Sequence, residues 1–170
     1  MARWITTERL CLHAIEDKDL EAMLALFTDA EVYQTFMLPD FKSHEEQVKL
    51  FERLKMLSSQ SERFVYGIYL KDELIGFIND VEIEGAEIEL GYVISPSQKN
   101  KGYATEVLKA MIEVLFAEGF STVKAGAFEE NIASIRVMEK SGMTRIAKRD
   151  EITYRGKTHR CVYYEKKYKN

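Results

Sequence analysis

The sequence predicts an α/β fold (of the α+β kind) with a mixed central β-sheet of about seven strands flanked by helices. Apolar residues alternate along some segments and recur every three or four residues along others, which are the periods of strands and helices. The strand-like segments lie both next to one another and on either side of helices, an order that gives antiparallel and parallel pairs in one sheet. With 170 residues, 46% hydrophobic and 31% charged, the chain is expected to form a single domain over residues 1–170.

The first third of the chain is expected to hold one strand and two helices. Residues 9–13 alternate in polarity, as a half-buried strand does. Apolar residues then recur at helical spacing over 20–27, after the acidic pair Glu16-Asp17. Ser43 and Glu46 have the spacing of a capping box, which predicts that a second helix opens at Ser43.

The middle of the chain predicts three strands and one long helix. Residues 64–70 alternate towards a polar turn and 74–78 continue beyond it, so this pair is expected to form a hairpin. A strand rich in Ile and Val is expected over 84–95. After a polar loop, a wide apolar stripe predicts a helix from about Tyr103 that Gly119 ends.

The last third predicts three strands and one helix. Residues 122–128 form a short apolar strand. Asn131 can cap a helix that stops near Gly142. Two strand-like runs, 144–154 and 158–168, follow and are joined by a short polar turn, which predicts a final hairpin.

Composition disfavours several classes of function. The net charge of −4 argues against a nucleic-acid partner bound through phosphate neutralisation. No signal peptide opens the chain and no apolar run is long enough for a membrane span, so we expect a cytoplasmic protein with no membrane partner. The cysteines and histidines show no metal-ligand spacing, so we expect no metal; they are Cys11, Cys161, His13, His44 and His159.

The polar loop before the long helix carries the first chemical signal. The first amides of a helix have no partner within it and carry the positive end of its dipole, so a glycine-bearing loop that feeds them can bind a pyrophosphate. Gly102 stands at that point, and Lys99 and Lys101 add positive charge. The loop matches neither a P-loop nor a dinucleotide fingerprint, and an ordinary loop with a favourable helix start is the alternative interpretation.

The strand, loop and helix from Glu87, followed by a strand and a second helix up to Gly142, resemble the GNAT acetyltransferase superfamily. Lys101-Gly102-Tyr103-Ala104-Thr105-Glu106 resembles the second half of its acetyl-CoA pyrophosphate motif. Asn131-x-x-Ser134 and the run from Arg136 to Met143 resemble its second signature. The branch similar to ribosomal-protein N-acetyltransferases is indicated by Thr7-Glu8-Arg9-Leu10-Cys11-Leu12 and by the final turn Arg155-Gly156-Lys157.

This resemblance implies a GNAT fold and an acetyl-CoA-dependent N-acetyltransferase. The acceptor implied is a primary amine on a protein N-terminus, a ribosomal protein or a small molecule. In the family the fourth and fifth strands splay apart, which exposes backbone amides for the thioester oxygen and the pantetheine arm. The cofactor-binding residues implied are Tyr92, Val93, Ile94, Lys99, Asn100, Lys101, Gly102, Tyr103, Ala104, Thr105, Asn131 and Ser134.

Two side chains are the catalytic candidates. Glu89 lies in an otherwise apolar strand, where burial can raise the pKa of a carboxyl into the range of a general base, and it matches a position that carries Glu in many members of the branch. The alternatives are that Glu89 faces solvent or pairs with a lysine, and Glu87 on the same strand face is the second choice. The Ser134 hydroxyl can stabilise or protonate the departing thiolate, or it can simply help to cap its helix.

This chain departs from the family pattern at two places. Lys99 stands where the motif has Gln or Arg, although a cation there still suits a phosphate. Met138 occupies the position where many members carry a tyrosine thought to protonate the thiolate, and a thioether cannot donate a proton. The general acid therefore has no assignment from the sequence.

The acceptor pocket is expected to be built by residues 28–42 and the final hairpin. Phe27, Tyr33, Phe36 and Phe41 make the first of these segments aromatic, which suits either a pocket wall or a lid over the core. A non-catalytic acyl-CoA-binding or sensing module, and a phosphate-binding regulator without CoA, are the competing hypotheses. The sequence does not set the oligomeric state, and a homodimer is compatible with it.

Overall fold

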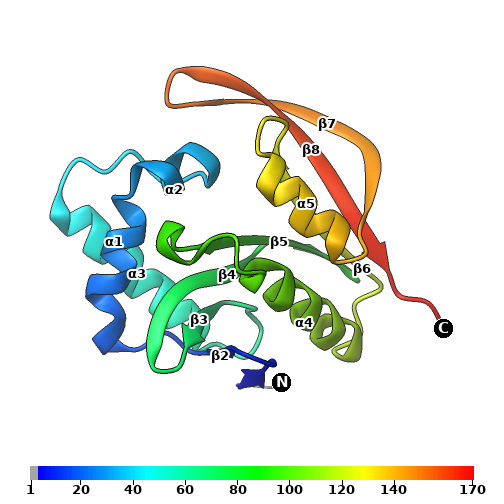
Figure 1. Ribbon diagram of the computed structural model, residues 1–170, viewed down its shortest axis with the longest axis horizontal. Helices are drawn as coiled ribbons and strands as arrows, with labels where there is room; N and C mark the ends of the chain where they lie inside the picture. The colour runs from blue at the N-terminus through cyan, green and yellow to red at the C-terminus, as the bar shows by residue number, and fades with distance from the viewer. Residues whose placement is uncertain (1–3) are drawn as a thin grey trace. The chain divides into compact units, whose positions relative to one another are not determined.

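A computed structural model describes residues 4–170 and confirms the mixed α/β class (Figure 1). One sheet of eight strands has the order β1-β2-β3-β4-β5-β6-β8-β7. The strand beyond the expected seven is β1, which is only Ile5–Thr6. The chain divides into two compact units, the first comprising the chain up to Asn79 with Tyr92–Tyr103, and the second Asp80–Gly91 with Ala104–Asn170.

The first unit contains the N-terminal strands and three helices. Its elements are β1, β2 (Cys11–His13), α1 (Leu20–Phe27), α2 (Ala30–Thr35), α3 (His44–Ser58), β3 (Tyr66–Leu70), the first part of β4 (Glu73–Glu84) and the end of β5 (Glu87–Ile94). Strands β1 to β4 pair antiparallel, so the predicted hairpin of β3 and β4 is confirmed. Helices α1 and α3 lie side by side (Figure 1).

The second unit contains the parallel part of the sheet and the C-terminal hairpin. Its elements are the end of β4, the start of β5, α4 (Tyr103–Ala117), β6 (Thr122–Phe128), α5 (Ile132–Lys140), β7 (Thr144–Tyr154) and β8 (Lys157–Lys167). Strands β5 and β6 are parallel, and the crossover between them carries α4, while β8 pairs antiparallel with both β6 and β7. The long hairpin of β7 and β8 turns at Arg155 and Gly156, both with positive φ, as a tight hairpin turn requires (Figure 1).

Helix ends follow the local signals in the sequence, with one difference. Ser43 caps α3 by accepting the Glu46 backbone N–H at 3.2 Å. The Glu46 carboxylate, however, accepts from the Lys42 N–H at 2.6 Å, so the reciprocal half of the predicted capping box is made one residue earlier. Gly119, with φ of +101°, ends α4 as predicted, because glycine adopts this left-handed conformation without strain.

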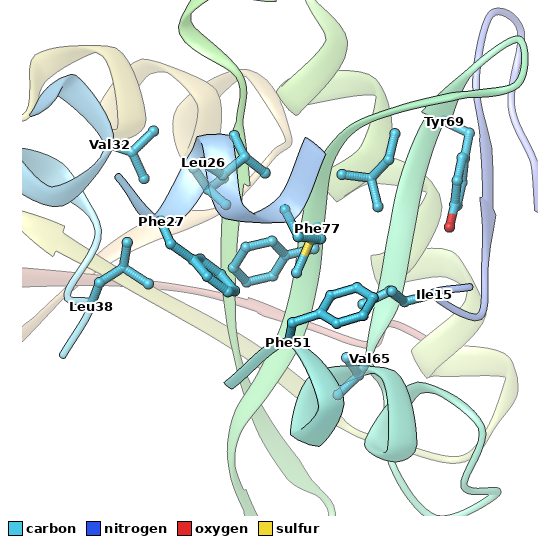
Figure 2. Packing of buried hydrophobic residues seen from close by; sticks show 12 residues of the cluster. Ile15, Leu26, Phe27, Val32, Leu38, Phe51, Val65, Tyr69 and Phe77 are labelled. Atoms are coloured by element: carbon cyan, nitrogen blue, oxygen red, sulfur yellow. The ribbon is translucent and has the colours of Figure 1, made fainter. Parts of the chain in front are cut away.

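An aromatic and aliphatic cluster forms the core of the first unit (Figure 2). Phe27 and Phe36 pack edge-on against Phe77 of β4, with ring centroids 6.4 and 5.4 Å apart. Phe51 of α3 and Tyr69 of β3 are almost fully buried in the same cluster. Burying a large apolar side chain contributes about 1.5–3 kcal/mol, so this cluster fixes α1, α2 and α3 on their strands.

In the second unit, alternation along β5 separates a core face from a polar face. Ile88 and Leu90 are buried, whereas Glu87 and Glu89, which alternate with them, are half-buried. The buried side of α4 consists of Val107, Leu108, Met111, Ile112 and Leu115. Because side chains alternate along a strand, the same register that buries the leucine and isoleucine holds both carboxylates on the opposite face.

Candidate active site

The loop between β5 and α4 has the backbone expected of an anion site. Asn100 and Gly102 have φ of +62° and +81°, so the chain turns through the left-handed region twice before α4 begins at Tyr103. Turns of this kind gather backbone N–H groups into concavities that bind anions, and the first turn of α4 adds its unpaired amides. The loop that the sequence predicts as the pyrophosphate site therefore ends at Gly102, directly before the first residue of α4, as expected.

Arg9 braces this loop, and sequence reasoning did not single it out. Its guanidinium donates to the Lys101 carbonyl at 2.8 Å and lies 4.6 Å above the centre of the Tyr103 ring. A side chain added at Gly102 would come within 3.3 Å of the same guanidinium. One planar cation thus contacts Lys101 and Tyr103, the residues on either side of Gly102, a use for which arginine is better suited than lysine.

The two lysines of the loop have partners within the protein. Lys101 donates to the side-chain oxygen of Gln98 at 2.9 Å, and Lys99 forms an ion pair with Glu31 of α2 at 2.8 Å. Both partners of the second pair are exposed, and exposed pairs are worth little, so a phosphate can displace Glu31 at small cost. The role of Lys99, Asn100, Lys101 and the residues after them in binding CoA stays a prediction.

Strand β5 stops pairing with β6 before it ends. The paired residues run from Glu87 with Thr122 to Leu90 with Ala125, although β5 continues to Ile94. Strand β6 goes on pairing with β8 as far as Phe128. The pairing of β5 with β6 therefore ends at Leu90, and the role of Tyr92, Val93 and Ile94 in presenting backbone groups to the substrate stays a prediction.

Gly76 of β4 lies against the backbone of Val93 and Ile94, and it is a second residue that the sequence did not single out. An ideal Cβ at Gly76 would lie 2.1 Å from the Val93 carbonyl oxygen, far inside van der Waals contact. The neighbouring Ser95 N–H donates to the Ile75 carbonyl at 2.6 Å. Only glycine permits this approach, so Gly76 fixes the path of the backbone at Val93.

Glu89 and Glu87 share a strand face but differ in their surroundings. Glu87 forms an ion pair with Lys124 of β6. Burial raises the pKa of the Glu89 carboxyl above its ordinary value, and this effect exceeds the lowering by Lys148 and Lys124. A raised carboxyl pKa suits general-base catalysis near neutral pH, and the role of Glu89 as the base stays a prediction.

The start of α5 is built as the sequence predicts. The Asn131 side-chain oxygen accepts the Ser134 backbone N–H at 3.2 Å, which confirms Asn131 as the cap. Met138 of α5 is fully buried in the protein core, at the position where a tyrosine is common in the family. The proposed roles of Asn131 and Ser134 towards CoA stay predictions.

The aromatic segment of residues 28–42 packs into the core and is partly helical. It contains α2, which Asp29 caps by accepting the N–H groups of Glu31 and Val32 at 2.9 and 3.3 Å. Phe27 is buried, and Phe41 lies beside it with the rings tilted and their centroids 5.7 Å apart. Of the two interpretations of these aromatic residues, the core lid is the one that their packing supports.

Two of the histidines, His13 and His159, and both cysteines hold structural positions. His13 stacks between Trp4 and Tyr69, and His159 pairs with Glu130 and stacks on Phe128. Both cysteines are free thiols whose pKa is raised by burial, as expected of inert packing. Within residues 4–170, no His, Cys, Asp and Glu side chains group to hold a metal ion. Over the same residues, no helix has the length and apolar character to cross a membrane.

Comparison with known proteins assigns this fold and site to a family. The acetyltransferase (GNAT) domain family matches residues 9–144. An uncharacterised N-acetyltransferase of Bacillus subtilis (strain 168), YnaD, is 36% identical over 143 residues, which are 83% of this chain and 82% of that protein. The chain belongs to the GNAT acetyltransferase family, and it is an N-acetyltransferase that uses acetyl-CoA.

Solved structures agree with this assignment over nearly the whole chain. A GNAT acetyltransferase from Bacillus anthracis aligns with a TM-score of 0.82 and 29% identity, covering 96% of this chain and 98% of its own. RimL, a ribosomal L7/L12 alpha-N-protein acetyltransferase in complex with coenzyme A, aligns with a TM-score of 0.84 and 20% identity, covering 96% and 97%. At that identity the second likeness concerns the fold alone.

Proposed function

We propose that this enzyme acetylates the primary amine of a protein or peptide N-terminus by direct attack on acetyl-CoA, with Glu89 as the general base. The observation that carries the role of Glu89 is its contrast with Glu87: one carboxyl is desolvated with a raised pKa, and the other is held by Lys124. The choice of acceptor draws on the fold shared with RimL, an alpha-N-protein acetyltransferase.

The proposed reaction uses the acceptor amine, the Glu89 carboxylate, backbone amides of β5 and the Ser134 hydroxyl. The acceptor reaches the site as an ammonium and loses a proton to Glu89, directly or through water. Its nitrogen then forms a bond to the thioester carbon, and the carbonyl oxygen becomes an anion that backbone amides in the segment Tyr92–Ile94 stabilise. The carbonyl then re-forms and the bond from carbon to sulfur breaks, while the nitrogen gives its second proton to solvent and becomes the amide. The thiolate takes a proton from the Ser134 hydroxyl, which recovers one from solvent, and Glu89 returns its proton to solvent.

The same proposal assigns the binding of acetyl-CoA to backbone rather than to side chains. The pyrophosphate lies against the amides of Gly102, Tyr103, Ala104 and Thr105, with the charges of Lys99 and Lys101 beside it. Asn100 shapes the turn through its positive φ. The close approach that Gly76 permits supports a defined backbone at Val93, as a pantetheine arm bound by strand-like hydrogen bonds needs.

A comparison of Glu89→Gln with Glu87→Gln tests the role of the base. Release of CoA thiol is measured with acetyl-CoA and a panel of N-terminal peptides, polyamines and small amines. General-base catalysis contributes about 10²- to 10⁴-fold, so Glu89→Gln is expected to lower kcat/KM by at least about 100-fold on the best acceptor. Glu87→Gln, the matched control on the same strand face, is expected to stay within a few-fold of wild type. Unchanged turnover in Glu89→Gln would remove Glu89 from the mechanism.

One observation favours a second function, a non-catalytic acyl-CoA sensor. Met138 is buried where a proton-donating tyrosine is common in the family, so the chain lacks that acid. A sensor binds acetyl-CoA but releases no thiol with any amine in the panel. The same assay therefore separates the two functions, with calorimetric binding of acetyl-CoA as the common reference.

A further inference from the structure

Strand β7 carries a bulge opposite a single residue of β8. Arg145 pairs with Tyr164 and Arg149 pairs with Val162, so residues 146–148 of β7 face only Tyr163. The two extra residues keep Asp150 in register with Cys161, on the same face of the hairpin as Tyr163. Bulges of this kind re-aim side chains and are frequent beside active sites.

Tyr163 contacts one charged residue within this bulge, Lys148, and one that follows it, Asp150. Lys148 Nζ lies 4.4 Å above the centre of the tyrosine ring, and the tyrosine hydroxyl donates to an Asp150 carboxylate oxygen at 2.8 Å. Burial, and then the bond to Asp150, raise the pKa of the Tyr163 hydroxyl, so it remains a donor at neutral pH. One buried side chain therefore holds a cation on its face and an anion at its tip.

The ring itself is fixed by the strand on its other side. Gly126 of β6 pairs directly with Tyr163, and an added Cβ at Gly126 would lie 2.8 Å from the ring carbon Cε1. Phe128 and Cys161 pack in the same small cluster. The position of the hydroxyl, and with it that of Asp150, follows from this packing.

Tyr163 of β8 and Glu89 of β5 lie on the two strands that flank β6 in the sheet. In the parallel register Glu89 of β5 lies opposite Lys124 of β6, and Gly126 is two residues further along β6 on the same face. Strand spacing and rise place the backbones of Glu89 and Gly126 roughly 8 Å apart. The charged groups that act on Glu89 come from three elements: Lys148 and Asp150 of β7, Lys124 of β6 and Glu82 of β4.

We propose that Tyr163 is a positioning residue of the catalytic base, because it fixes Lys148 and Asp150 at the distances from which they set the charge environment of Glu89. The inference rests on the proposed function, since it needs Glu89 to be the base. Packing alone does not require the hydroxyl: a phenylalanine fills the same cluster but leaves Asp150 without this donor. The sequence of β7 alone gives no sign of the arrangement, because the bulge appears only in the pairing.

The first test is the dependence of kcat/KM on pH in three single variants. Asp150 raises the pKa of Glu89 and Lys148 lowers it, so Asp150→Asn is expected to move the acidic limb to lower pH and Lys148→Met to higher pH. Tyr163→Phe is expected to move the limb in the direction of Asp150→Asn, because the carboxylate is no longer held. Tyr164→Phe, which removes a hydroxyl from the other face of β8, is the matched control and is expected to leave the limb in place.

The second test is direct titration of the Glu89 carboxyl by carbon NMR, with the resonance assigned from Glu89→Gln. It needs no turnover, so it separates this inference from the proposed function. If Glu89→Gln retains activity but Tyr163→Phe lowers the pKa of Glu89, Glu89 is not the base and the electrostatic arrangement stands. If the titrations of Tyr163→Phe and wild type superimpose, Tyr163 does not position these charges and the inference fails.

Discussion

Substitution of Gly76 by alanine probes the backbone that the thioester is expected to follow. The new Cβ would start 2.1 Å from the Val93 carbonyl oxygen and 3.1 Å from the Ile94 Cα. Ordinary contact between such atoms needs well over 3 Å, so the carbonyl must retreat by roughly 1 Å. Overpacking of this kind costs about 1–3 kcal/mol, and weakening of the Ser95 to Ile75 hydrogen bond adds about 1 kcal/mol. The free energy of unfolding is therefore expected to fall by about 2–4 kcal/mol.

The same displacement is expected to impair catalysis in the molecules that remain folded. A misplacement of about 1 Å can cost about 100-fold, so kcat/KM for acetyl-CoA should fall by about that factor. Urea denaturation measures the stability, and thiol release measures the rate below the unfolding transition. Gly85→Ala is the control: Gly85 faces open space with φ of +59°, and its substitution should cost about 1–2 kcal/mol without a kinetic effect. Wild-type stability and kinetics in Gly76→Ala would refute the argument.

Two further predictions concern the base and the loop. Burial raises the folded-state pKa of Glu89, so the contribution of this carboxyl to stability is complete below its unfolded-state pKa and is lost as pH rises through its folded-state pKa. Thermal denaturation should therefore show Glu89→Gln to be more stable than wild type at pH 8 and equal to it near pH 3.5. Equal stability of the two proteins at both pH values would contradict the raised pKa. Arg9→Met removes the contacts to Lys101 and Tyr103 and is expected to raise KM for acetyl-CoA about tenfold, with kcat little changed. Arg9→Lys is expected to recover only part of this loss, because lysine lacks the planar guanidinium. An unchanged KM in Arg9→Met would show that the loop does not depend on Arg9 for its conformation.

Periodicity in the sequence predicts most of the elements but not the shortest ones. Strand β6 coincides with the apolar run 122–128, and α4 begins at Tyr103 as its stripe indicates. Strand β1 has two residues and α2 has six, too few for a period to show. Both elements are stabilised by tertiary packing, which a local pattern does not encode.

The candidate site was predictable where its signals are local in the sequence. Gly102 and the cap at Asn131 act on their own neighbours, so a short motif reveals them. Arg9 is 92 residues from Lys101, which it contacts, and Gly76 matters only because β5 passes close to it. The contrast between Glu87 and Glu89 depends on where Lys124 falls in the parallel register, which no spacing along β5 records.

A crystal structure of the wild-type enzyme grown with acetyl-CoA would show directly where the cofactor binds. We expect the diphosphate at the backbone amides of residues 102–105 and the thioester along Tyr92–Ile94. A cofactor bound elsewhere on the chain, with both segments untouched, would contradict it.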